Sequence, residues 1–131
     1  MSALAEPLRR GLPLAFWAYV AAVVLMHLSL PQAWVWHIAF VALIGMLFTY
    51  PAHAAVQGDK LRLEMSVSWG FALVGLLGLL LTPLLLIAAI AGHGLLDLAK
   101  YRGLGAEVPV WYLLSCAVFD LAYAAYLLGH L

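Results

Sequence analysis

The chain has 131 residues, of which 67% are hydrophobic and only 9% are charged. A soluble domain carries about 25% charged residues, so this composition indicates a protein that lies in the lipid bilayer. The net charge is zero at neutral pH, which provides no basic surface for a nucleic acid, and none is expected as a partner. A single cysteine, Cys116, excludes a disulfide within the chain.

The first two apolar runs predict two membrane spans, at about 13–30 and 33–56. A signal peptide would have a shorter apolar core and a small-residue cleavage site, so we expect the first run to be a retained helix. Pro31 ends this first span. The second span ends in QGDKLRLE, the most polar stretch of the chain.

The run from Met65 to Lys100 has almost no polar interruption. A single helix of about 36 residues would be about 54 Å long at 1.5 Å per residue, which exceeds the roughly 30 Å hydrocarbon core of a bilayer. The natural break is Thr82-Pro83, because proline suits the first turn of a helix and disfavours helical geometry in the residue before it. This break predicts spans at about 63–81 and 83–101.

A last span is predicted at about 109–128, after the loop RGLGAEV. The sequence therefore predicts a single integral membrane domain over residues 1–131, an all-α polytopic transmembrane helical bundle of five spans. Four spans are the alternative, if the long apolar run stays one helix. The longest loop is about ten residues, which leaves no room for a soluble domain.

The basic residues favour five spans over four. Five spans put all six of them on one side of the membrane, whereas four spans would separate the last two from the others. The positive-inside rule then places the N-terminus in the cytoplasm and the C-terminus outside, in a bacterial-type inner membrane. The six are Arg9, Arg10, Lys60, Arg62, Lys100 and Arg102.

Three ionisable residues fall inside the last two predicted spans. Asp97 lies about 6 Å from the inner end of its span, and His93 lies one turn deeper on the same helix face. Asp120 lies about eleven residues into the last span, near the bilayer centre at about 17 Å. A charge there costs about 3 kcal/mol, so the residue is expected to face the bundle interior with a partner.

Consecutive antiparallel spans pack side by side, and His93 falls at a depth between those of Cys116 and Asp120. This geometry allows a contact between His93 and Asp120, and whether the two touch is left open. Gly92 and Gly94 permit close approach of the two helices. Cys116 and Tyr123 share the face of Asp120. The predicted site for a ligand or proton is a polar stripe that opens toward the cytoplasm; it comprises His93, Asp97, Asp120, Cys116 and Tyr123.

Three further residues near the inner end could line the mouth of this stripe: His53, Glu64 and Tyr50. Pro51 could kink the helix there, and His53 could contact Glu64. A His-x3-Asp pair with one more acid is a weak metal pattern, so no metal site is predicted and no cofactor is assigned. No catalytic residue is assigned either, because a buried cysteine such as Cys116 is usually a packing residue.

The segment HGLLDLAKYRGLGAEVPVWYLLSCAVFD resembles a pattern in an uncharacterised family of small bacterial integral membrane proteins. The resemblance covers about residues 90–125 and falls on His93, Asp97, Cys116 and Asp120. It implies that these four positions act together, and it implies no activity. Where that pattern continues with histidines, this sequence has Lys100 and Tyr101, which argues against a histidine-rich metal site.

These features predict a small membrane protein that binds or transports a small or lipophilic ligand or protons. Asp120 would accept the proton or cation, and His93 would set the charge state of Asp120. One alternative is an intramembrane enzyme that uses His93 and Asp120 as an acid–base pair on a lipid-phase substrate. Another is a structural accessory subunit in which the pair only joins two helices, a contact worth about 0.6 kcal/mol. The small size suggests a homodimer or a membrane complex.

Overall fold

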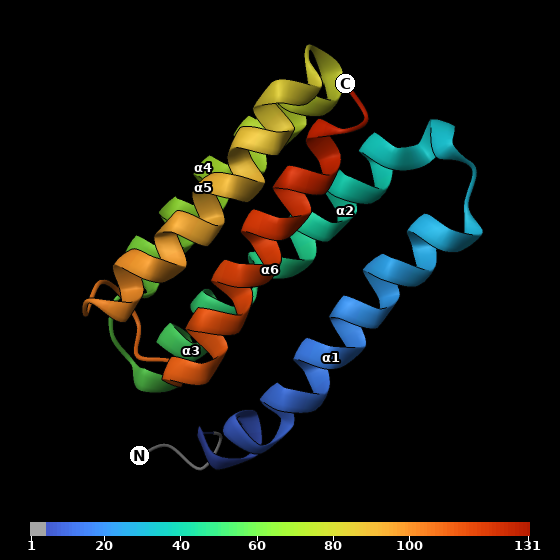
Figure 1. Cartoon of the computed structure of the whole chain (residues 1–131). Coiled ribbons are helices and arrows are strands. Elements are labelled where there is room, and N and C mark those ends of the chain that lie inside the picture. Colours follow the sequence, from blue (N-terminus) through green and yellow to red (C-terminus); the bar gives the residue numbers. More distant parts are fainter. Residues whose placement is uncertain (1–4) are drawn as a thin grey trace.

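The computed structural model describes residues 5–131, which are 84% helical and contain no strand within that range. Figure 1 shows the helices as one antiparallel bundle. In chain order the elements are α1 (Ala5–Ser29), the short 3-10 helix η1 (Gln32–Trp34), α2 (Val35–Met46), α3 (Thr49–Gln57), α4 (Leu61–Leu80), α5 (Pro83–Tyr101) and α6 (Val110–Leu128).

Within residues 5–131, five segments are long and apolar enough to cross a membrane, with η1, α2 and α3 together forming the second of them. The predicted all-α bundle of five spans is thus confirmed, and the four-span alternative is wrong. The long apolar run breaks where expected, because Thr82 adopts an extended conformation (φ −159°, ψ 126°) immediately before Pro83 at the start of α5.

Large apolar side chains cover much of the outside of the bundle. Leu14, Leu28 and Leu81 are each about three-quarters exposed, and Trp17 and Trp69 are about two-thirds exposed. A soluble protein rarely exposes apolar patches on this scale. Together with the five apolar spans, this surface identifies a membrane protein whose natural surroundings are lipid.

The observed helix bounds differ from the predicted spans at two prolines. Helix α1 begins at Ala5 and continues through Pro13, because that proline removes only the bond to the carbonyl of the exposed Arg9 near the helix end. The second span is interrupted at residues 47–48, since Pro51 cannot donate to the carbonyl of Leu47. The Ser68 hydroxyl of α4 donates to that carbonyl instead, at 3.0 Å.

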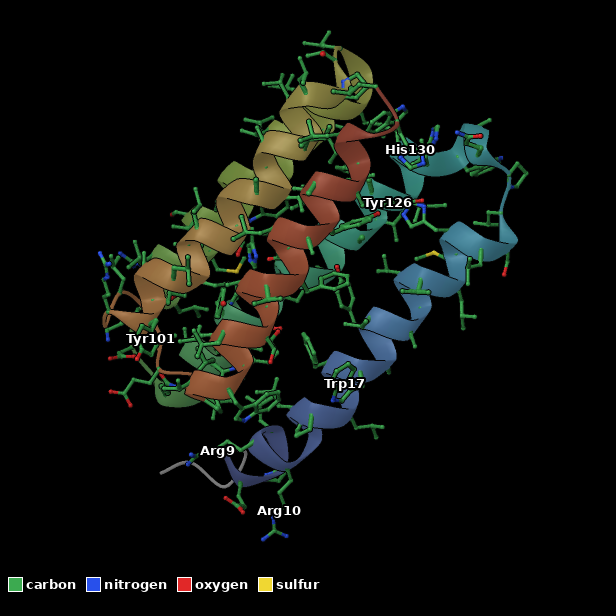
Figure 2. All side chains as sticks on the ribbon, in the orientation of Figure 1. Arg9, Arg10, Trp17, Tyr101, Tyr126 and His130 are labelled. Carbon is green, nitrogen blue, oxygen red and sulfur yellow. The ribbon has the colours of Figure 1, made fainter. Side chains whose placement is uncertain are left out.

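Helix α1 lies at one edge of the bundle and the α4–α5 pair at the other, with α6 and α2 between them (Figure 1). Helix α5 packs most extensively against α6 and α4. We call the end near the N-terminus, where Figure 2 labels Arg9 and Arg10, the basic end. The end of the bundle near the C-terminus is called the opposite end.

Candidate functional site

His93 and Asp120 form a buried pair between α5 and α6, an arrangement that the sequence allows. Each lies one residue beyond the midpoint of its 19-residue helix, and their side chains are 3% and 2% exposed. His93 Nδ1 donates to Asp120 Oδ2 at 2.8 Å. The helices can approach this closely because a Cβ atom at Gly94 would lie only 3.1 Å from Asp120 Cβ.

Asp97 joins the pair from one turn along α5. Its Oδ2 atom lies 3.8 Å from His93 Nδ1, and its Oδ1 atom accepts a hydrogen bond from the hydroxyl of Tyr50. The Tyr50 ring also stacks on the His93 ring, with centroids 5.7 Å apart and an interplanar angle of 24°. We refer to Tyr50, His93, Asp97 and Asp120 together as the His93 group.

Tyr50 lies at the centre of this group, although the sequence predicts it only at the mouth. It belongs to the first turn of α3, directly before Pro51, and is 2% exposed. The second span is interrupted directly before α3, and the hydroxyl of Tyr50 in the first turn of α3 reaches Asp97 on α5. The ring of Phe71, from α4, meets His93 edge-on at 5.7 Å.

Two buried polar atoms of the group have no hydrogen-bond partner among the described residues, His93 Nε2 and Asp97 Oδ2. Buried polar atoms are nearly always paired, and those that are not often mark functional sites or unseen water. The group therefore keeps one free nitrogen and one free carboxylate oxygen inside the bundle, which is unusual for a contact that only joins helices.

A buried ion pair lies between the His93 group and the basic end. Lys100 Nζ, in the last turn of α5, donates to Glu64 in the first turn of α4. Glu64 Oε1 also accepts the backbone N–H of Ala106 at 2.7 Å, which ties down the loop before α6. Lys100 Nζ lies 4.3 Å from the centroid of the Tyr50 ring, so this ion pair adjoins the His93 group.

Lys100 is a part of the site that the sequence does not predict, because its place beside a polar loop favours a charge at the membrane surface. Its position three residues after Asp97 puts both on one face of a helix, and that signal could have found it. The contact that the sequence allows between His53 and Glu64 is not formed. Glu64 instead pairs with Lys100, while His53 Nδ1 donates to the carbonyl of Thr49 at 2.9 Å within α3.

Cys116 lies beside Asp120 in a cavity of about 130 Å³. We call it the Asp120 cavity. Thr49 and Tyr112 hydrogen bond to each other across it, with 2.7 Å between their oxygens. The cavity is lined from α1, α2, α3 and α6 by Leu12, Ala15, Phe16, Tyr19, Gly45, Met46, Thr49, Tyr112, Cys116, Phe119 and Asp120.

Tyr123 is the predicted stripe residue that lies apart from the His93 group. Its hydroxyl is 2.7 Å from Nε2 of His27, on α1, and the two form a hydrogen bond. Tyr123 follows Asp120 by three residues on the same face of α6. The hydrogen-bond partner of Tyr123 is therefore on α1, whereas that of Asp120 is on α5.

His93, Asp97 and Asp120 are also the one group of His, Cys, Asp and Glu residues, within 5–131, whose ligand atoms lie close enough to share a metal ion. Those atoms are all within 4.8 Å of one another. A metal ion there would have to replace the proton that His93 Nδ1 donates to Asp120.

Comparison with protein-family models, curated proteins and solved structures finds no match to this chain. The geometry of the site is therefore the basis for any functional assignment, and the resemblance on residues 90–125 stays a prediction.

Proposed function

We propose that this protein binds protons within the membrane and passes them along the His93 group. The observation that supports the proposal best is the contact of one imidazole nitrogen, His93 Nδ1, with two carboxylates. It lies 2.8 Å from Asp120 and 3.8 Å from Asp97. Ionisable residues placed this deep in membrane helices commonly form proton relays.

Two carboxylates beside the same imidazole nitrogen allow a proton to pass from one carboxylate to the other. The protonation state of the imidazole is the same before and after the transfer. Starting from an imidazolium, an ionised Asp120 and a protonated Asp97, His93 first gives its Nδ1 proton to Asp120. The 3.8 Å between Nδ1 and Asp97 then has to close to hydrogen-bond distance, and the same nitrogen takes the proton of Asp97. One proton has then moved from Asp97 to Asp120. The net charge of the three side chains is zero before and after the transfer, which suits an apolar environment.

The size of the neighbouring cavity favours a proton carried by water over a lipophilic ligand. Sites for drug-sized ligands enclose about 300–1,000 Å³, whereas the Asp120 cavity encloses about 130 Å³. A water molecule requires about 10–15 Å³ of such volume, so the cavity has room for several. Asp120, Thr49 and Tyr112 line it and offer those waters polar partners.

The same proposal includes a direction in the membrane. All six basic residues belong to the basic end or to the helix turns next to it, and the positive-inside rule assigns such an end to the cytoplasm of a bacterial-type inner membrane. Asp97 is the carboxylate nearer to that end of α5. Protons would thus enter at Asp97 from the cytoplasmic side and reach Asp120 at mid-membrane, or travel in reverse.

Proton flux into proteoliposomes tests the proposal. Purified protein is reconstituted with a pH-sensitive dye inside the vesicles, EDTA in all buffers and a potassium diffusion potential set by valinomycin. The native protein is expected to acidify or alkalise the lumen according to the sign of the potential, and Asp120→Asn and His93→Gln are expected to abolish the flux. Asp59→Asn, at an exposed loop position, is the matched control and should retain it.

The structural alternative predicts a different result for the same variants. If the His93–Asp120 contact only joins two helices, the variants lose folded protein, and native protein carries no flux. Size-exclusion chromatography of each variant in detergent separates loss of fold from loss of function. Folded Asp120→Asn protein that conducts as fast as the native chain would overturn the proposal.

A further inference from the structure

Two cavities follow one another along the seam between α1 and α6. The Asp120 cavity contacts α1 between Leu12 and Tyr19. A second cavity, of about 270 Å³, contacts α1 between Val23 and Leu28, further toward the opposite end; it is open to the outside of the bundle, where Leu28 is 78% exposed. We call this second one the His27 cavity; from α6 it is lined by Phe119, Ala122, Tyr123 and Tyr126.

Of the residues described, only Phe119 lines both cavities. Its ring meets Tyr19 of α1 edge-on, with centroids 5.7 Å apart, and stacks on Tyr123 at 5.7 Å with an angle of 24°. The aromatic ring of Phe119 thus stands between the two spaces, held on each side by a tyrosine. An apolar ring at such a constriction excludes water and ions.

Groups able to carry a proton lie on both sides of Phe119. Asp120 lines the cavity on the side of the basic end. The hydrogen-bonded His27 and Tyr123 line the other cavity. Beyond them, His27 and Tyr126 also line a third space, of about 260 Å³, together with His130 near the C-terminus. Figure 2 shows Tyr126 and His130 at the opposite end of the bundle.

We propose that Phe119 is the barrier in a proton route across the membrane, with Asp120 as the last acceptor on one side and the His27–Tyr123 pair as the first acceptor on the other. This inference rests on the proposed function, and it adds the route by which a proton leaves Asp120 toward the opposite end. The ring blocks the seam in the described conformation, so passage requires its side chain to rotate or water to enter past it.

The sole cysteine allows the barrier to be tested without any assay of proton flux. Cys116 lines the Asp120 cavity, and Ag⁺ is a thiol-binding ion small enough to enter it. Sided membrane vesicles are exposed to Ag⁺ in chloride-free buffer and then denatured, and the remaining thiol is labelled with maleimide. Native Cys116 is expected to be protected from Ag⁺ applied at the opposite end, and Phe119→Ala should lose this protection.

Two controls keep this result specific. Val118→Ala removes a neighbouring side chain that is 70% exposed on the outside of α6, and it should leave Cys116 protected. In a second chain, Cys116→Ala with Ala122→Cys, the thiol moves to the His27 cavity. This thiol should react with Ag⁺ applied at the opposite end while Phe119 is intact. The comparison tests the barrier even if Phe119→Ala does not fold. The inference would be overturned if native Cys116 reacts from the opposite end, or if the thiol introduced by Ala122→Cys does not.

Proton flux then separates this inference from the proposed function. Phe119→Ala is expected to increase the flux, and His27→Gln with Tyr123→Phe is expected to reduce it while leaving Cys116 protected. If Asp120→Asn abolishes flux but these variants leave it unchanged, the function stands and the route is wrong. If Phe119→Ala exposes Cys116 but no variant or native protein conducts, the barrier is real and the proposed function fails.

Discussion

Helix α6 has two different neighbours, and they are packed against it in different ways. On the α5 side, a Cβ atom at Gly94 would approach Asp120 Cβ to 3.1 Å and the carbonyl of Ala117 to 3.3 Å. On the α1 side, two cavities separate the helices along their length. Only three hydrophobic side chains described in α1 are buried: Leu12, Phe16 and Val23.

This difference in packing shows how Asp120 can be held in place by one helix and still lie beside space for water. The tight contact with α5 holds His93 at 2.8 Å from Asp120, and close packing of this kind resists small displacements. The loose contact with α1 leaves space for water beside the same carboxylate. Asp120 lies on the boundary between the two regions, which is the position that a group exchanging protons with solvent requires.

The largest effect on the tight side is expected from breaking the Glu64–Lys100 pair. Glu64→Gln keeps an acceptor for the N–H of Ala106 but leaves the ammonium of Lys100 buried and uncompensated, and losing one partner of a buried pair costs about 3–5 kcal/mol. Glu64→Gln combined with Lys100→Met should recover most of that loss, because no buried charge remains. Unfolding free energies in detergent measure both.

Asp59→Asn again supplies the control, since it removes an exposed carboxylate from the same end of the bundle and should change stability little. Equal destabilisation of the single and the double variant would mean that the side chains stabilise the bundle by packing rather than as an ion pair.

A smaller effect is expected from Gly78→Ala, where α4 meets α5. A Cβ atom there would overlap the backbone nitrogen of Leu86 and lie 2.7 Å from its Cα atom, so the helices must move apart, at about 1–3 kcal/mol. Gly70→Ala, in the same helix, meets nothing within 4 Å and should be neutral or stabilising by up to about 1 kcal/mol. Thermal unfolding in detergent compares them; similar losses at both positions would contradict close packing of α4 on α5.

The parts of the site that the sequence predicts are those that depend on neighbouring helices alone. The short connection between the last two spans fixes their relative depth, and the rise of 1.5 Å per residue then places His93 opposite Asp120, as observed. Likewise, Pro83 predicts the break between α4 and α5 because the restriction it imposes on Thr82 is local.

The parts that the sequence does not predict depend on contacts between helices far apart in the chain. Tyr50 belongs to the second span and Asp97 to the fourth, and the two meet across the bundle. Tyr123 bonds to His27 because α1, which is distant in the sequence, also lies beside α6. The rotation of one helix against a distant one is set by the packing of many side chains, and a sequence periodicity does not contain it.

The smallest expected effect compares two hydroxyl groups, one on each side of the molecule. Tyr19, on α1, donates to the carbonyl of Ala42, on α2, at 2.9 Å. That carbonyl lies in α2 and also accepts a helical hydrogen bond, so Tyr19→Phe should cost only about 0.6 kcal/mol. Ser68 donates to the carbonyl of Leu47, which Pro51 leaves without a helical donor. Ser68→Ala should therefore cost about 1 kcal/mol or more, because a buried acceptor becomes unpaired.

Both changes remove one hydroxyl and can be measured by unfolding under identical conditions. A larger loss for Tyr19→Phe would mean that α1 is held as firmly as α4, and the seam could then no longer be regarded as the side of the bundle that admits water to Asp120.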